Sequence, residues 1–147
     1  IADRLLPEGL IVYTEDRIGN RAEKKSDSTE LNIPLSILVN GNSASASEVL
    51  SGAVKDYGKG KLIGTKTFGK GLVQAVINLE DGAGIKVTIA RYFTPSGVCI
   101  HEKGIEPDIV VELDEKYEYY PVSQVPREDD VQLKKAIEVI KEQLGEN

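Results

Sequence analysis

The sequence predicts an α/β domain with a β-rich extension, and three observations support this prediction. An apolar run over 34–40, a helical pattern over 45–57 and an apolar run over 61–63 form a strand–helix–strand unit. Such a unit implies a parallel pair of strands. From Leu72 onward the pattern changes to short β-rich runs, and a last amphipathic helix begins at Asp130. The 147 residues, 40% of them apolar, suffice for one domain with a core.

The first thirty residues predict the end of a helix, one strand and a polar connection. Residues 1–6 have helical character, and Pro7 and Gly9 terminate the helix. The aliphatic run 10–14 predicts a strand. Residues 16–30 are polar and charged, which is typical of a solvated loop or a weak hairpin.

The central unit is the clearest part of the pattern. Pro34 begins a short aliphatic strand, and the helix that follows has apolar residues at spacings of three and four, namely Ala46, Val49, Leu50, Ala53, Val54 and Tyr57. Gly58 suits the position just after the end of this helix. Residues 61–63 then form the second strand of the unit.

The rest of the chain predicts a hairpin, a strand and a closing helix. Strands over 72–79 and 84–92 flank a turn at 80–83, a second turn lies at 94–97, and 108–113 is a further strand. Residues 115–120 are charged and aromatic, and 121–126 form a linker. The closing helix has an apolar stripe formed by Val131, Leu133, Ile137, Ile140 and Leu144.

Composition excludes several classes of function. The net charge is −6 and the basic residues are scattered, which argues against nucleic acid as a partner. No apolar run is long enough to span a bilayer. The single Cys99 permits no internal disulfide and is expected to act as a small hydrophobe rather than as a nucleophile. The chain has no methionine and begins at Ile1, so we expect a fragment of a longer protein.

Three serines lie at the turn between the first central strand and the helix. A serine at such a turn is exposed at the carboxyl end of a strand and next to the unpaired N–H groups of a helix start. The same residues also fit a capping box, with Ser45 as N-cap and Glu48 three residues later. Local pattern alone leaves both roles open. Because His101 is the only histidine and lies in another segment, a nucleophilic serine here needs a lysine as its base.

Lys70 is the candidate base, although an exposed loop lysine is the ordinary alternative. It lies between Gly69 and Gly71, where the backbone can turn tightly. The segment 64–70 matches seven positions of a phosphate-binding loop, but Gly71 replaces the required Ser or Thr and a strand follows instead of a helix. Asp56, eleven residues after Ser45, is a lesser candidate with an exposed acid near a helix end as its alternative.

Five blocks of the sequence, in this order, closely resemble the carboxyl-terminal processing proteases, also called tail-specific proteases. The blocks are Asn42-Ser-Ala-Ser-Ala-Ser-Glu48, Lys55-Asp-Tyr-Gly58, Gly64-Thr-Lys-Thr-Phe-Gly-Lys-Gly-Leu-Val-Gln74, Arg91-Tyr-Phe-Thr-Pro-Ser-Gly97 and Lys103-Gly-Ile-Glu-Pro-Asp108. The resemblance covers roughly residues 1–112. It implies a serine endopeptidase that cleaves polypeptides near their carboxyl termini with a serine–lysine dyad and needs neither cofactor nor metal.

The resemblance also assigns roles to individual residues. It makes Ser45 the nucleophile, Lys70 the general base and Gln74 the side chain that orients the lysine. The backbone N–H of Ala46 becomes one donor of the oxyanion hole. Ser43 and Ser47, which flank the nucleophile, then have supporting or structural roles.

What the resemblance implies for the whole molecule is broader. It implies a fold of the Clp-protease/crotonase type, a spiral of strand–strand–helix units, with 1–113 as the carboxyl-terminal part of the protease core and 114–147 as a linker and helix. The family's peptide-binding PDZ domain and upstream glycine loop have no counterpart in the chain, so we expect this piece alone to show little or no activity. The family further implies polypeptide substrates with an apolar carboxyl terminus and an extracytoplasmic, periplasmic or membrane-associated location, and it permits a homo-oligomer.

The lysine must be uncharged to act as a base. Burial disfavours a charged ammonium, and we expect a largely apolar pocket at Phe68 and Val73 to supply that burial. Gln74 can hold the amine without adding charge. Two alternatives remain: a crotonase-like acyl-thioester enzyme, which does not need Ser45 and Lys70 together, and a non-catalytic peptide-binding relative.

Overall fold

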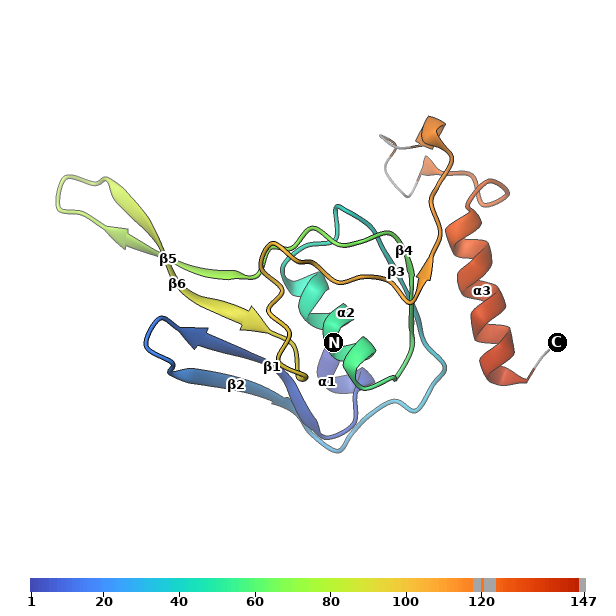
Figure 1. Cartoon of the computed structure of the whole chain (residues 1–147), viewed down its shortest axis with the longest axis horizontal. Helices are drawn as coiled ribbons and strands as arrows, with labels where there is room; N and C mark the ends of the chain where they lie inside the picture. The colour runs from blue at the N-terminus through green and yellow to red at the C-terminus, as the bar shows by residue number, and fades with distance from the viewer. Residues whose placement is uncertain (118–119, 121–123, 146–147) are drawn as a thin grey trace.

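Two sheets enclose one central helix (Figure 1). The computed structural model describes residues 1–117, 120 and 124–145. In chain order the elements are α1 (Ala2–Leu5), β1 (Gly9–Asp16), β2 (Arg21–Ser26), β3 (Ser36–Val39), α2 (Ala46–Asp56), β4 (Lys61–Gly64), β5 (Leu72–Asn78), β6 (Gly84–Phe93), β7 (Ile109–Val110), a 3-10 turn (Glu115–Tyr117) and α3 (Val131–Leu144). The predicted α/β class is confirmed.

The predicted parallel pair forms the smaller sheet. β3 and β4 run parallel, with Ser36 opposite Lys61 and Val39 opposite Gly64. β7 adds to the other side of β4, again parallel. The strand expected over 108–113 is shorter than predicted, since only Ile109–Val110 pairs. The predicted site therefore follows a strand of a parallel sheet, at its carboxyl end.

The larger sheet is antiparallel and has the strand order β2-β1-β6-β5. The polar segment 16–30, expected as a solvated loop or weak hairpin, contains the turn and the second strand of the β1–β2 hairpin. The β5–β6 hairpin is also confirmed, with its turn closed by a hydrogen bond from Leu79 N–H to Ala83 O at 2.8 Å. Its far end projects from the body of the molecule as a two-stranded arm (Figure 1).

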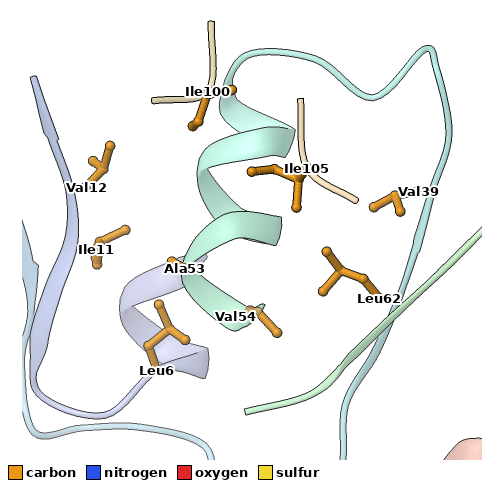
Figure 2. Packing of buried hydrophobic residues seen from close by; sticks show 9 residues of the cluster. All are labelled: Leu6, Ile11, Val12, Val39, Ala53, Val54, Leu62, Ile100 and Ile105. Carbon is orange, nitrogen blue, oxygen red and sulfur yellow. The ribbon is translucent and has the colours of Figure 1, made fainter. Parts of the chain in front are cut away.

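The main core surrounds α2 and joins the two sheets (Figure 2). It consists of buried aliphatic residues from both sheets, from α2, from the end of α1 and from the segment after β6, namely Leu6, Ile11, Val12, Val39, Ala53, Val54, Leu62, Ile100 and Ile105. Fully burying one such large side chain contributes about 1.5–3 kcal/mol. Gly58 ends the helix with a positive φ of 61°, as predicted. The core thus fixes α2, and with it the turn at the start of α2.

Helix α3 covers the other side of β3 and β4 but turns a different face to them than its apolar stripe suggests. Asp130 caps the helix as predicted, through Leu133 N–H at 2.8 Å. The buried residues are Gln132, Ala136 and Val139, whereas Val131, Ile137 and Leu144 of the stripe are 42–54% exposed. On this face Ala136 and Val139 pack against Ile63, while the Gln132 amide donates to Val111 O and Gln143 accepts from Leu35 N–H.

Parts of the tail predictions fall outside the described residues. Positions 118–119 of the aromatic segment and 121–123 of the linker are not described. Among the residues that are described, no helix combines the length and apolar character needed to cross a membrane.

Candidate active site

The turn between β3 and α2 holds Ser45 in an unusual backbone conformation. After Val39 the chain reverses through Asn40, whose side chain accepts from Asn42 N–H at 2.9 Å and whose carbonyl accepts from Ser43 N–H at 2.8 Å. Ser45 is the N-cap residue and has φ 56° and ψ −113°. A positive φ at a residue other than glycine costs about 1–3 kcal/mol and persists only where the surroundings impose it.

This geometry suits a nucleophile. A serine on a sharp, strained strand-to-helix turn presents its hydroxyl outward while the helix start supplies N–H donors next to it. Ala46 is the first residue of α2 and is exposed. Within the described part of the chain, its backbone N–H makes no hydrogen bond. The predicted nucleophile and the predicted oxyanion donor are therefore adjacent and accessible.

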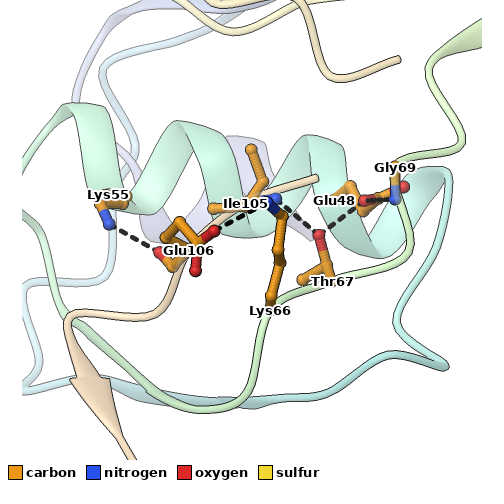
Figure 3. A network of polar contacts seen from close by, with 7 residues as sticks. All are labelled: Glu48, Lys55, Lys66, Thr67, Gly69, Ile105 and Glu106. Atoms are coloured by element: carbon orange, nitrogen blue, oxygen red, sulfur yellow. Dashed lines mark hydrogen bonds and ion pairs between the residues drawn. The ribbon is translucent and has the colours of Figure 1, made fainter. Parts of the chain in front are cut away.

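Glu48 joins this turn to the segment that carries Lys70. Its carboxylate is completely buried, and four donors converge on it. Oε1 accepts from the Thr67 hydroxyl and from Gly69 N–H, both at 2.6 Å (Figure 3). Oε2 accepts from Lys70 N–H at 2.8 Å and from Ser45 N–H at 2.9 Å. An ionised carboxylate only accepts hydrogen bonds, so four donors satisfy it even without water.

As a result, one oxygen atom holds the main chains of both predicted catalytic residues. The bond from Ser45 N–H is the Glu48 half of the predicted capping box. A further main-chain bond, from Phe68 N–H to Ser43 O at 3.0 Å, ties the two segments together a second time. The sequence indicated the capping role of Glu48 but gave no sign of its contacts with residues some twenty positions later.

The segment 100–105 supports the lysine loop from behind. Thr67 and Ile105 exchange two bonds, from Thr67 N–H to Ile105 O at 3.1 Å and from Ile105 N–H to the Thr67 hydroxyl at 2.7 Å. A Cβ on Gly71 would stand 2.3 Å from His101 N. Only glycine therefore fits at this crossing, and the loop has little freedom to shift.

The lysine side chain itself is not buried in this chain. Lys70 is exposed, and Phe68, expected to form part of an apolar pocket, is 67% exposed. Val73 is only half-buried. The expected pocket is therefore absent from the structure, because no described segment lies over this side of the loop. No acidic side chain of the described residues forms an ion pair with Lys70.

Gln74 lies in β5, in the strand predicted for it. Its side chain is exposed and its amide donates to the Thr88 hydroxyl across the hairpin at 3.4 Å. This amide makes no hydrogen bond to Lys70. A strand rather than a helix follows Lys70, which agrees with the exclusion of a phosphate-binding loop.

The remaining candidates have structural surroundings. Asp56 is exposed at the end of α2 and accepts from Ser96 N–H at 2.7 Å, which anchors the turn at 94–97. The Ser43 hydroxyl accepts from Asn40 N–H at 3.1 Å, a structural role. Cys99 is half-buried, less than expected for a core hydrophobe.

Comparison with known proteins places this geometry in a wider context. Residues 1–111 match peptidase family S41. Over 113 residues the chain is 50% identical to the carboxyl-terminal-processing protease of Synechocystis sp., an alignment covering 76% of this chain and 26% of that protein. It is 46% identical to the chloroplastic C-terminal processing peptidase of Tetradesmus obliquus over 111 residues, or 74% of this chain and 24% of that one.

Solved structures give the same result. The photosystem II D1 C-terminal processing protease superposes with a TM-score of 0.71 at 46% identity, over 76% of this chain and 29% of that chain. The tricorn protease shares the fold at 21% identity, with a TM-score of 0.57 over 90% of this chain and 12% of that one. The chain thus spans about a quarter of the length of the curated relatives it matches.

Proposed function

Because the chain belongs to peptidase family S41, we propose that it supplies the nucleophile and the general base of a serine endopeptidase. One observation carries the proposal: the Glu48 carboxylate holds the strained Ser45 turn and the main chain of Lys70 on a single oxygen atom. Neither a capping box nor a loop lysine requires that link. A serine–lysine dyad does require its two members to be held together.

In the proposed reaction the Ser45 hydroxyl attacks the carbonyl carbon of the scissile peptide bond. The neutral amine of Lys70 takes the hydroxyl proton and then delivers it to the leaving nitrogen. The carbonyl oxygen becomes an oxyanion and accepts a hydrogen bond from Ala46 N–H. Water then attacks the acyl–serine ester, with Lys70 again as the base, and releases the shortened polypeptide.

The exposure of Lys70 in this chain bears on how the base becomes active. Removing water from around an amine favours its neutral form. We propose that bound substrate and the remainder of the full-length protein cover the lysine loop and that Phe68 then forms an apolar wall beside it. None of the acidic side chains among the described residues pairs with Lys70. This supports Lys70 as the base, because a paired carboxylate would stabilise the charged form of its amine.

The finer properties are proposals taken from the family resemblance. We propose a spiral of strand–strand–helix units for the complete core, cleavage near the carboxyl termini of polypeptides, and substrates with an apolar end. We also propose an extracytoplasmic location. The names of the relatives support the type of cleavage, since each is called a carboxyl-terminal or C-terminal processing enzyme.

The test measures hydrolysis of a peptide by the full-length wild-type protein and by three variants. Ser45→Ala and Lys70→Arg should both be inactive, the second because a guanidinium stays protonated. His101→Ala is the matched control, because it removes the one imidazole near the loop and should keep wild-type turnover.

The alternatives give different outcomes. An acyl-thioester enzyme of related fold, or a passive peptide binder, should not depend on Lys70 in this way. Activity that survives Lys70→Arg, or that disappears in His101→Ala, would rule out the serine–lysine mechanism.

A further inference from the structure

The outer edge of β5 is a free strand edge next to the proposed catalytic site. β5 is the last strand of its sheet, so among the residues that the structure describes only β6 pairs with it. It begins at Leu72, two residues after Lys70. Along a free edge the outward N–H and C=O groups are available to another extended chain.

The register shows which main-chain groups point outward. In an antiparallel pair, opposite residues alternate between hydrogen-bonded and non-bonded pairs. Leu79 N–H bonds to Ala83 O at one end of the hairpin, and Tyr92 N–H bonds to Gly71 O at the other. Both ends give the same alternation: odd-numbered residues of β5 bond to β6. The groups at the outer edge therefore belong to the even-numbered residues, Leu72, Gln74, Val76 and Asn78.

This edge lacks the features that protect free edges. Proteins usually guard an exposed edge with lysine, other charges or proline. β5 has the sequence LVQAVIN, which contains none of them. On the opposite edge of the same arm, Lys86 lies across from Val76 in the register. The two edges of the hairpin therefore differ. The β6 edge carries a lysine, whereas the β5 edge, which begins near Lys70, has no lysine, other charge or proline.

One face of the arm is apolar and exposed. Ala75 pairs with Val87 and Ile77 pairs with Ile85, which places these four side chains on the same face. Ile77 is 52% exposed and Ile85 49%. An additional strand on the edge of β5 would place every second side chain on this face. A partner strand with apolar residues at alternate positions would thus extend it.

We propose that the polypeptide substrate binds as an added strand along the outer edge of β5, with apolar side chains at alternate positions against the face formed by Ala75, Ile77, Ile85 and Val87. The proposal rests on the proposed peptidase function. The occupant follows from position, since Glu48 holds the Lys70 main chain beside Ser45 and β5 leads directly away from it. Main-chain bonds to β5 would supply affinity for any sequence, and the apolar face would supply selectivity.

The first experiment uses two proline variants in the full-length protein with Ser45→Ala, so that bound peptide is not cleaved. Val76→Pro removes an outward N–H from the β5 edge, and Lys86→Pro removes the outward N–H from the other edge at the same level of the hairpin. Neither group bonds within the hairpin, so edge proline is tolerated at both positions. Affinity is measured by fluorescence anisotropy with a labelled peptide that has leucine at alternate positions.

Val76→Pro should weaken binding by about threefold to tenfold, the value of one main-chain hydrogen bond. Lys86→Pro should bind like the parent. An N-methyl group on alternate amides of the peptide should weaken binding at those positions only. Equal affinities for both proline variants would refute the proposal, as would a peptide insensitive to N-methylation.

Hydrogen exchange of the same Ser45→Ala protein gives an answer that does not depend on the folding of a variant. The amides of Gln74, Val76 and Asn78 should exchange quickly without peptide and slowly with it. Slow exchange without peptide would show that another strand of the full-length protein occupies the edge. Exchange that stays the same when peptide binds would place the substrate elsewhere. Either result refutes the proposal. Hydrolysis by the wild-type protein tests the proposed function separately. If the protein cleaves peptide but its β5 edge binds none, the added-strand proposal fails while the serine–lysine mechanism stands.

Discussion

Replacing Glu48 by glutamine should disable the site without touching either proposed catalytic side chain. The change keeps the shape of the side chain but converts one acceptor oxygen into an NH₂ donor. In the wild type, Oε1 faces Thr67 and Gly69 N–H, and Oε2 faces Lys70 N–H and Ser45 N–H. Whichever way the amide turns, at least one N–H loses its acceptor.

The less costly orientation places the NH₂ group at the Oε1 position. The Thr67 hydroxyl can rotate to accept from it, but Gly69 N–H is then buried against another donor. A stranded buried donor costs about 1–3 kcal/mol, and bonds to a neutral partner are weaker than those to a charge. We therefore expect a loss of about 3 kcal/mol or more in the free energy of unfolding. Because Ser45 and Lys70 lose their common anchor, kcat should also fall by about tenfold to a hundredfold.

The assays are denaturant unfolding and peptide hydrolysis of the full-length protein. Glu106→Gln is the matched control, because it makes the same change at an exposed carboxylate whose ion pair with Lys66, at 2.8 Å, lies on the surface. The control should change stability by less than about 0.5–1 kcal/mol and leave kcat unaltered. A Glu48→Gln variant as stable and as active as this control would show that the buried carboxylate does not hold the site together.

Two other perturbations follow from the same structure. Gly71→Ala should lower the free energy of unfolding by about 1–3 kcal/mol and should also lower turnover, because the new Cβ would stand 2.3 Å from His101 N. Gly41→Ala is the control, since nothing lies within 4 Å of the Cβ position there. Both variants are compared by thermal unfolding and by peptide hydrolysis. The backbone and side-chain bonds from Asn20 hold the pKa of the Asp16 carboxyl below its usual value. The contact should therefore stabilise the β1–β2 turn at neutral pH and be lost as the pH falls through that lowered pKa. The protection factor of the Asn20 amide, which is its exchange rate corrected for the intrinsic rate at each pH, should fall at low pH in the wild type and stay constant in Asp16→Asn. A wild-type protection factor that does not change with pH would contradict this.

Local pattern was sufficient for most of the elements. The parallel strands, the hairpin over 72–92 and the caps at Ser45 and Asp130 depend on residues close together in the chain, so the sequence predicted them. The sequence also indicated the candidate nucleophile and the candidate base, since Ser45 lies at a strand-to-helix turn and Lys70 lies between two glycines. For α3, periodicity found the helix but indicated a different buried face, because contacts with residues far away in the chain decide which side of the helix is buried. Ala136 and Val139 pack against Ile63, and Gln132 bonds to Val111 O.

By itself the sequence determined the backbone hydrogen bonding within each element and the residue types available for chemistry. Only the tertiary structure decided which of those residues meet. Glu48 looked like a capping residue, yet its carboxylate is buried between the start of α2 and the segment 67–70, and its four donors come together only after these two segments fold against each other. The exposure of Lys70 likewise depends on tertiary structure, because no described segment packs over this side of its loop. Burial and long-range hydrogen bonds depend on segments far apart in the chain, and no local pattern of residues records where those segments come to lie.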